Sequence, residues 1–358
     1  MSKSNNEERR DIVNKRLSEI NDKIVNPNKK NISKTPSENI QEQINDTPKN
    51  SNKLKTYLLR IAIVVMIFFV LKMILLKRRF DMLSIKNKLI EVENKRPIIY
   101  DLIYDKSKTN SPVIIFCHGY KGFKDWGCWP IMAKSFASKG FAFFKFNFSF
   151  NGGTVNNPID FPDLKAFSEN NYSKELSDIN EVIDWVTNEY ENNKALDIEN
   201  LILMGHSRGG GIATIFASED NRIKKLITLA GVSDYESRFP KEEAFCEWKS
   251  RGVYYVKNSR TNQDMPHKFQ FYKDFVENKK RLTISKSAKR LKIPHLIVHG
   301  DNDSSVDFSE ALCLNSWSPK GILCRIKGAN HVFGAKHPWK GTITVSYTHL
   351  TLPTILLV

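Results

Sequence analysis

The sequence predicts an α/β protein with a doubly wound, mainly parallel sheet. From residue 98 onward, short apolar runs alternate with segments whose apolar residues recur at helical spacing. Of the 358 residues, 41% are hydrophobic and 11% are aromatic, which is ample for a packed core. Strands that are separated by helices favour a parallel sheet, and the ligand site of such a sheet lies beyond the carboxyl ends of its strands.

The expected elements follow one another along the chain. We predict helices at residues 131–138 and 175–189 and from residue 212 onward; in the second of these, Leu176, Ile179, Val182, Ile183 and Val186 share one face. The apolar runs predict strands at residues 98–104, 113–117, 141–148, 201–204, 226–230, 295–299 and 322–326.

Two long segments interrupt this alternation. Residues 149–171 contain two Gly and two Pro and are predicted to form a loop after a strand. Residues 236–291 are long enough for a cap, and residues 252–255 could pair with residues 268–272 as a hairpin. We expect both segments at the mouth of the site, where loops carry specificity and gating.

The N-terminal region differs in composition from the rest. Residues 1–56 are polar and poor in aromatic residues, which predicts a disordered tail. Residues 57–79 have an unbroken apolar centre, with Arg60 and Lys72 placed to reach the interface, and predict a single transmembrane helix. The basic residues after this span favour a cytoplasmic catalytic part. The alternatives are a buried helix, or a fusion in the gene model to a cytoplasmic enzyme that starts at Met82.

The last residues, 345–358, resemble the translation of a sequencing-library adapter, so we expect the folded domain to span residues 82–344. The natural C-terminus would then be missing, together with the helix that would close the sheet after His331.

The net charge of +16 is concentrated at the front of the chain. Residues 1–80 hold 17 Lys and Arg against 8 Asp and Glu, a net charge of +9. The later Lys residues are dispersed, without a basic stripe or interleaved aromatics, so we do not expect nucleic-acid binding. The five Cys include no C-x-x-C pair, which favours a reducing compartment and no structural zinc. The oligomeric state is not indicated by any of these features.

The prediction of function starts from one Gly-rich turn. Gly205-His206-Ser207-Arg208-Gly209 follows an apolar strand and precedes a helical pattern. Such a sharp corner exposes a Ser hydroxyl at the carboxyl edge of the sheet and directs a helix N-terminus at the same point. We therefore expect Ser207 to be a nucleophile; the alternative is a Ser that only caps the helix.

A Ser nucleophile needs a base, and the base needs a carboxylate. Asp303 comes soon after the strand at residues 295–299, and His331 lies in the loop after the last predicted strand. The chain order Ser207, Asp303, His331 is the one expected of a serine hydrolase with a strand-turn-helix nucleophile. Asp301 and Asp234 remain alternatives for the acid.

The oxyanion formed in acyl transfer needs two hydrogen-bond donors. The backbone N–H of Arg208, directly after the nucleophile, is the first, and the N–H of Tyr120, after the strand at residues 113–117, is the second. Gly119 allows a close approach of the chain, and His118 is expected to be a structural hydrogen bonder. For the Arg208 side chain we expect a surface or helix-capping role ahead of contact with an acidic substrate group.

Three motifs together resemble the α/β-hydrolase superfamily: residues 118–126 (HGYKGFKDW), 205–210 (GHSRGG) and 299–303 (HGDND). The similarity covers residues 90–335 and is strongest to the dienelactone-hydrolase-like and cinnamoyl or feruloyl esterase-like serine hydrolases. It implies a cap insertion, a small-molecule ester substrate and hydrolysis of carboxylic esters through an acyl-enzyme. Dienelactone hydrolases proper have Cys where this chain has Ser207, which disfavours their reaction.

No metal-ligand spacing and no phosphate-binding loop occurs in the sequence, so we expect no cofactor. A peptidase or a thioesterase would use the same three residues. A membrane-tethered, catalytically silent binding protein on a hydrolase scaffold is the alternative from another class.

Overall fold

The computed structural model describes residues 60–68 and 81–341. The chain divides into two units, Met1–Val70 and Leu71–Val358. In the first unit, residues 60–68 form an exposed helix. A helix that could span a membrane is not found in the part of the chain that the structure describes. The rest of the predicted 57–79 span, the predicted tail of residues 1–56 and residues 345–358 lie outside the described residues, so these predictions stay predictions.

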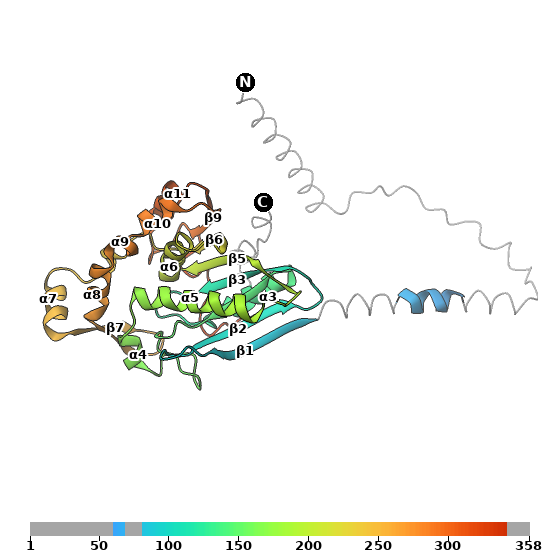
Figure 1. Cartoon of the computed structure of the whole chain (residues 1–358), viewed down its shortest axis with the longest axis horizontal. Coiled ribbons are helices and arrows are strands. Elements are labelled where there is room, and N and C mark those ends of the chain that lie inside the picture. The colour runs from blue at the N-terminus through green and yellow to red at the C-terminus, as the bar shows by residue number, and fades with distance from the viewer. Residues whose placement is uncertain (1–59, 69–80, 342–358) are drawn as a thin grey trace, which may run out of the picture. The chain divides into compact units, whose positions relative to one another are not determined.

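The second unit contains a mainly parallel eight-stranded sheet (Figure 1). Its strand order is β1-β2-β4-β3-β5-β6-β9-β10. Strand β2 is antiparallel to both β1 and β4, whereas all the other neighbours are parallel. This confirms the predicted mainly parallel α/β sheet. The strands are β1 (Met82–Ile90), β2 (Ile98–Asp105), β3 (Ser111–Cys117), β4 (Ala142–Phe146), β5 (Leu196–His206), β6 (Ile223–Leu229), β9 (His295–Gly300) and β10 (Gly321–Ile326).

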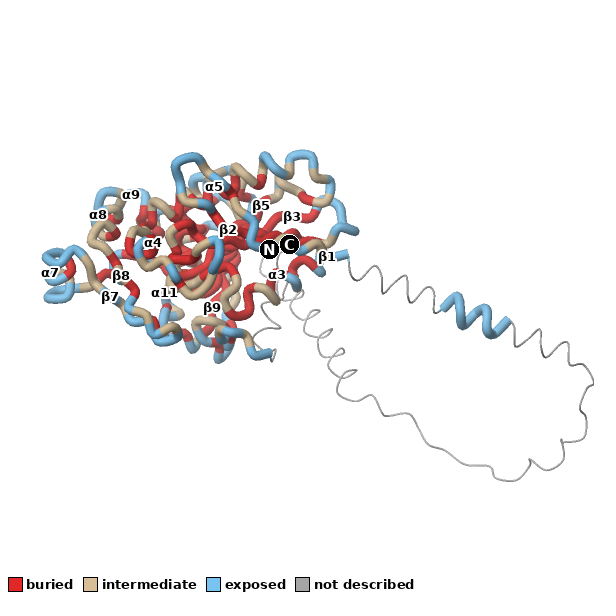
Figure 2. The backbone as a smooth tube through the Cα atoms, turned by 90° about the horizontal axis from the view of Figure 1, so that it is seen from below, coloured by how far each residue is buried: buried red, intermediate tan, exposed pale blue. Residues whose placement is uncertain are grey.

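Helices cover both faces of this sheet, and the strand side chains alternate between two hydrophobic clusters. Helices α5 (Tyr172–Glu189), α6 (Arg208–Ala217), α10 (Ile284–Arg290) and α11 (Phe308–Trp317) contribute to one cluster, and α3 (Trp129–Ser138) contributes to the other. In β3, for example, Ile115 belongs to the first cluster and Ile114 and Phe116 to the second. Figure 2 shows the central strands as the most buried part of the unit.

Residues 236–291 form a separate group of small elements between β6 and β9. They are η2 (Glu236–Arg238), α7 (Glu242–Arg251), the antiparallel hairpin β7 (Val253–Asn258) and β8 (Gln263–Lys268), α8 (Gln270–Glu277), α9 (Lys279–Leu282) and α10. Most of α7 is exposed, with Trp248 as its buried anchor. We call the segment 236–291 the cap.

Several local predictions were incomplete. The hairpin exists, but its second strand is β8, and most of the predicted partner 268–272 belongs to α8 or precedes it. The predicted loop 149–171 contains the short helix α4 (Leu164–Ser168), whose N-terminus is capped by the Asp163 side chain. Strand β1 was not predicted, because this edge strand alternates apolar residues with Lys and Asn and breaks its register between Ile85 and Lys88.

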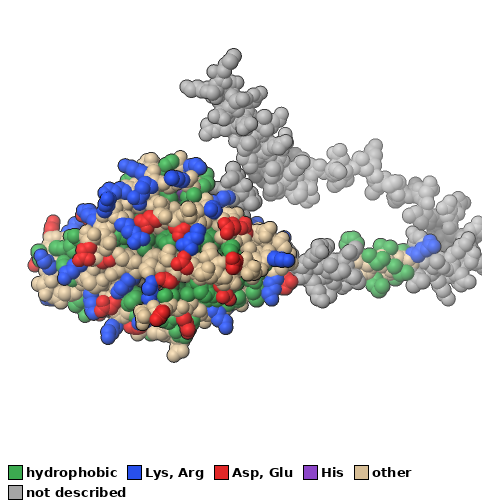
Figure 3. Space-filling view, viewed as in Figure 1, with side chains coloured by type: hydrophobic (Ala, Val, Ile, Leu, Met, Phe, Trp, Pro, Cys, Tyr) green, Lys and Arg blue, Asp and Glu red, His purple; other side chains and the backbone are tan. Residues whose placement is uncertain are grey.

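Charged side chains of both signs lie on the face of the unit that Figure 3 shows. Lys and Arg gather at its upper edge, in the region of α10 and α11 in Figure 1. The triad predicted above lies elsewhere, at the carboxyl ends of β5 and β9 and after β10.

Candidate active site

Ser207 lies at the corner between β5 and α6. Its backbone has φ 54° and ψ −122°, a strained conformation for a residue with a side chain. The corner is too tight for side chains on either flank, because a Cβ added at Gly205 would lie 2.2 Å from the Gly209 oxygen and one added at Gly209 would lie 2.4 Å from the His118 oxygen. The Ser207 N–H donates to the Leu229 carbonyl of β6 at 2.9 Å. The spacing of the two glycines is therefore a steric requirement of the turn.

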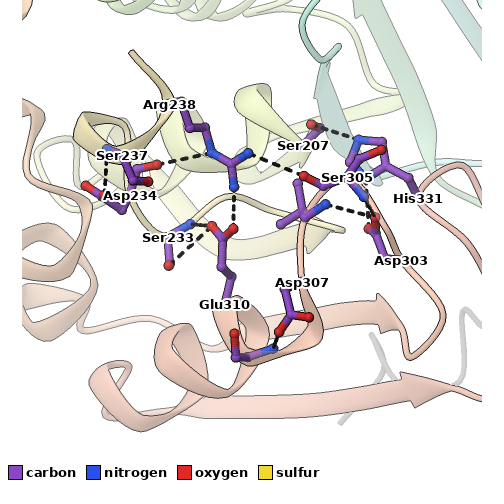
Figure 4. Close-up of polar contacts among 12 residues, drawn as sticks. Ser207, Ser233, Asp234, Ser237, Arg238, Asp303, Ser305, Asp307, Glu310 and His331 are labelled. Atoms are coloured by element: carbon purple, nitrogen blue, oxygen red, sulfur yellow. Dashed lines mark hydrogen bonds and ion pairs between the residues drawn. The ribbon is translucent and has the colours of Figure 1, made fainter. Parts of the chain in front are cut away.

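His331 joins Ser207 to Asp303 (Figure 4). The Ser207 Oγ lies 3.0 Å from the His331 Nε2, and the His331 Nδ1 lies 2.8 Å from the Asp303 Oδ2. Because a carboxylate only accepts hydrogen bonds, Nδ1 carries the proton and Nε2 is free to accept the proton of the Ser207 hydroxyl. The three residues come from the ends of β5, β9 and β10, as the chain order suggested.

Asp303 is buried and surrounded by donors. Its Oδ1 accepts from the N–H groups of Ser305 at 2.8 Å and Val306 at 2.9 Å. Its Oδ2 faces the His331 Nδ1 at 2.8 Å and the His299 Nε2 at 3.3 Å. Burial alone would raise the pKa of Asp303, but the hydrogen bonds from His299, His331 and Val306 outweigh it and hold the pKa well below the usual range. The carboxylate therefore stays ionised at neutral pH.

The two alternative acids have other partners. Asp301 binds Arg325 and the N–H of Gly328. Asp234 accepts from the N–H groups of Glu236 and Ser237 at the start of η2. Neither has a hydrogen bond to His331 among the described residues, so the geometry favours Asp303.

His206 holds the loop that carries His331, a role that the sequence did not indicate. Its Nε2 lies 3.0 Å from the His331 carbonyl oxygen and donates to it. Its ring lies 5.0 Å from the Trp129 ring and 4.8 Å from the His331 ring. Burial, with a contribution from His331, lowers the pKa of His206 to about 3, so the ring is neutral. His206 is adjacent to Ser207 in the sequence. Nothing in the sequence indicates that its ring binds the carbonyl of His331, 125 positions away.

Residues 118–126, which we call the oxyanion loop after the role predicted for them, pass close to Ser207. A Cβ added at Gly119 would lie 3.0 Å from the Ser207 Cβ. His118 is structural, as expected: its Nδ1 donates to the Gly119 oxygen at 2.9 Å, and its Nε2 accepts from the Phe148 N–H at 3.2 Å. The N–H groups of Tyr120 and Arg208 have no acceptor among the described residues, so both are free to bind a ligand oxygen.

The prediction of a surface or helix-capping role for the Arg208 side chain was wrong. The guanidinium is largely buried and pairs with Glu175 of α5 at 2.7 Å. It also lies against the rings of Tyr172 and Phe271, at 4.9 and 4.8 Å from their centroids. Arg208 therefore forms part of the wall of the site, with its charge balanced by Glu175.

Two cavities meet at Ser207 and His331, which line both of them. The larger, about 470 Å³, has an aromatic wall formed by Tyr120, Tyr172, Tyr235, Tyr254 and Phe271. The smaller, about 220 Å³, lies between the oxyanion loop and the cap residues Asn258 and Arg260. A substrate whose scissile bond lies at Ser207 thus has space on two sides of that bond. Within residues 60–68 and 81–341, no cluster of three or more His, Cys, Asp or Glu is arranged to hold a metal ion.

Comparison with known proteins finds a family model that matches part of the chain. A family model described as the alpha/beta hydrolase fold matches residues 112–248, which include the oxyanion loop and Ser207. Over these residues, the chain is similar to the alpha/beta hydrolases. This confirms the resemblance seen in the motifs and the expectation of a hydrolase. Asp303 and His331 lie beyond the matched residues, and the structure brings them to Ser207.

Solved structures of other proteins share the fold of this chain. Est1E from Butyrivibrio proteoclasticus with ferulic acid bound is 16% identical, with a TM-score of 0.55 over 75% of this chain and 98% of that chain. Alpha/beta hydrolase domain-containing protein 10 from mouse is 18% identical, with a TM-score of 0.55 over 75% and 97%. The monoacylglycerol lipase of Paleococcus ferrophilus is 14% identical, with a TM-score of 0.51 over 73% and 97%. At these identities the similarity describes the fold.

Among curated proteins, an uncharacterised 31.7 kDa protein from the traX-finO intergenic region of Escherichia coli is 27% identical to this chain over 130 residues. The alignment spans 34% of this chain and 38% of the relative's length.

Gly119→Ala tests how closely the oxyanion loop must approach Ser207. The new Cβ would lie 3.0 Å from both the Ser207 Cβ and the His206 Nδ1, so the loop has to move. We expect kcat for an aryl ester to fall by about 10- to 100-fold, with a smaller change in KM. Gly140→Ala is the control: its φ of +92° disfavours Ala, but nothing lies within 4 Å of the added Cβ. If Gly140→Ala lost as much kcat as Gly119→Ala, the steric explanation would be contradicted.

Proposed function

We propose that this protein is a serine hydrolase that cleaves carboxylic esters through an acyl-enzyme. The observation that carries the proposal is the chain of hydrogen bonds from the Ser207 Oγ through His331 to Asp303, with distances of 3.0 and 2.8 Å. A hydroxyl is a weak nucleophile until a base accepts its proton. The His331 Nε2 is placed to be that base.

In the first half of the reaction, the Ser207 Oγ attacks the ester carbonyl carbon while its proton passes to the His331 Nε2. The negative charge that develops on the carbonyl oxygen is stabilised by the N–H groups of Tyr120 and Arg208. One such donor typically contributes about 3 kcal/mol in the transition state. Asp303 holds the ring of His331 and stabilises its charged form.

Collapse of the tetrahedral intermediate breaks the bond to the alcohol oxygen, which takes the proton from His331. Ser207 is left as an ester of the acyl group. A water molecule then gives a proton to His331 as it attacks the same carbonyl, and the second collapse returns the proton to the Ser207 Oγ and releases the acid. The two cavities at Ser207 provide separate space for the acyl and alcohol parts of a small-molecule ester.

The test is a substrate panel on the full-length protein: p-nitrophenyl acetate and butyrate, amino-acid p-nitroanilides, and acyl thioesters. We expect the esters to have the highest kcat/KM and to release an initial burst of p-nitrophenol as the acyl-enzyme forms. Heat-denatured protein gives the background rate. Faster cleavage of the anilides would indicate a peptidase, and faster cleavage of the thioesters a thioesterase. Absence of turnover on all three classes would favour the binding protein and contradict the proposal.

A further inference from the structure

Four charged side chains form a ring beneath the oxyanion loop, and no step of the proposed mechanism uses them. They are Asp101, Lys124, Asp125 and Lys145. Asp101 and the two Lys are at most 2% exposed, while Asp125 reaches the surface with 30% of its side chain. Buried Lys and Asp are rare in proteins unless they are paired, so this cluster requires an explanation.

The charges in the ring alternate and balance. The Lys124 Nζ lies 2.8 Å from the Asp101 Oδ1 and also contacts Asp125. Lys145 contacts the same two carboxylates. Burial alone would raise the pKa of Asp125, but Lys145 and Lys124 outweigh it and lower the pKa to about 2. Each charge thus has two partners, and losing one charge would leave the others uncompensated in a buried site.

The ring joins the loop to the sheet. Asp101 of β2 and Lys145 of β4 lie opposite each other in the antiparallel pairing. Lys124 and Asp125 belong to the oxyanion loop. Two backbone contacts extend the connection: the Lys124 N–H donates to the Asn147 side chain at 2.7 Å, and the Asn87 N–H of β1 donates to Asp101 at 2.8 Å. The loop is therefore held by charges that are fixed on two rigid strands.

The other end of the loop lies at the nucleophile. Gly119 is close to Ser207, and only three residues separate Tyr120 from Lys124. A tight turn spans part of this distance, closed by the Gly122 N–H and the Gly119 oxygen at 3.0 Å. A second turn follows, from the Trp126 N–H to the Phe123 oxygen at 3.1 Å. With so short and so constrained a connection, the position of Lys124 determines where the Tyr120 N–H lies.

We infer that this ring of two Lys and two Asp is a positioning device, which fixes the Tyr120 N–H at the place where the oxyanion forms. The inference rests on the proposed function. An apolar cluster of the same volume could stabilise the fold as well as an ion-pair ring does. Ion pairs add a requirement of direction: each Lys must lie between two carboxylates, and this fixes the loop in one arrangement on the strands.

Two variants separate positioning from stability. Lys124→Met leaves the ring with a net negative charge and removes the contact between the loop and Asp101. Lys124→Met combined with Asp125→Asn also removes the contacts from the loop, but it leaves the neutral Lys145–Asp101 pair in the sheet. The double variant should therefore recover thermal stability without recovering the position of the loop. Ile183→Ala, a buried position on α5, is the control for destabilisation alone.

The measurements are made on the full-length protein. Titration with a fluorophosphonate counts competent active sites, so that kcat is expressed per site. For each variant we then measure the Tm, the KM and the inhibition constant of a trifluoromethyl ketone. Ser207 adds to this ketone to give a tetrahedral oxyanion, which needs the same donors as the transition state.

We expect both loop variants to lose at least tenfold in kcat per site, with KM changed less than twofold. Their affinity for the ketone should fall by the same factor. The double variant should have the higher Tm of the two, and Ile183→Ala should lower Tm with kcat per site unchanged. Recovery of kcat together with Tm in the double variant would overturn the inference, and so would an equal loss in Ile183→Ala. A wild-type protein that neither reacts with the fluorophosphonate nor cleaves esters would instead refute the proposed function.

Discussion

Ser207→Ala is expected to lower kcat for aryl esters by about five orders of magnitude. Without the hydroxyl no acyl-enzyme forms, and the pre-steady-state burst disappears. The residual rate would come from the oxyanion donors and substrate binding alone. Stopped-flow release of p-nitrophenol from the full-length protein measures both effects.

Ser218→Ala is the matched control, because Ser218 lies at the other end of the same helix and its hydroxyl binds the Ile215 carbonyl. Its kcat should stay within about twofold of the wild type, since it touches no part of the site. If Ser207→Ala kept more than about a tenth of the wild-type kcat with the burst intact, another residue would be the nucleophile.

Asp303→Asn is expected to lower kcat by about 10⁴-fold while the protein remains folded. The two Asp303 oxygens face four donors, from Ser305, Val306, His299 and His331. An Asn side chain has one acceptor oxygen and must direct its NH₂ group at some of these donors. The favoured response is a change of the His331 tautomer, which places a proton on Nε2 and prevents that atom from accepting the Ser207 proton.

Asp301→Asn distinguishes this effect from a general loss of negative charge near β9. Asp301 binds Arg325 and the Gly328 N–H and has no hydrogen bond to His331 among the described residues. Its kcat should change less than about threefold. A larger loss in Asp301→Asn than in Asp303→Asn would show that the acid had been assigned to the wrong residue.

Local sequence signals predicted the sheet and the elements that carry the site. The turn that places a Ser between two glycines at a strand-to-helix corner is required by backbone sterics within five residues. The sequence alone therefore indicates this turn. Asp303 and His331 could be proposed because each follows a recognisable apolar strand. The sequence favoured Asp303 but left Asp301 and Asp234 as alternatives, and the contact of the His331 Nδ1 with Asp303 favours the same choice.

Contacts between distant residues were not predictable from the sequence. The role of Arg208 was misjudged because Glu175, its partner, lies 33 positions earlier. The ring beneath the oxyanion loop pairs Lys124 with Asp101 of β2 and Asp125 with Lys145 of β4, and no pattern within the loop indicates either strand residue. Edge strand β1 was not predicted because one side of it is open to solvent, and polar residues therefore interrupt its apolar pattern.

The most direct test of the triad is to react the full-length protein with a fluorophosphonate and to locate the adduct by peptide mass spectrometry. We expect one adduct per chain on the peptide that contains Ser207, and at least a hundredfold slower labelling in His331→Gln, because the hydroxyl would lack its base. Modification of a different serine, or labelling of Ser207 that is equally fast without His331, would contradict the assignment of Ser207, His331 and Asp303.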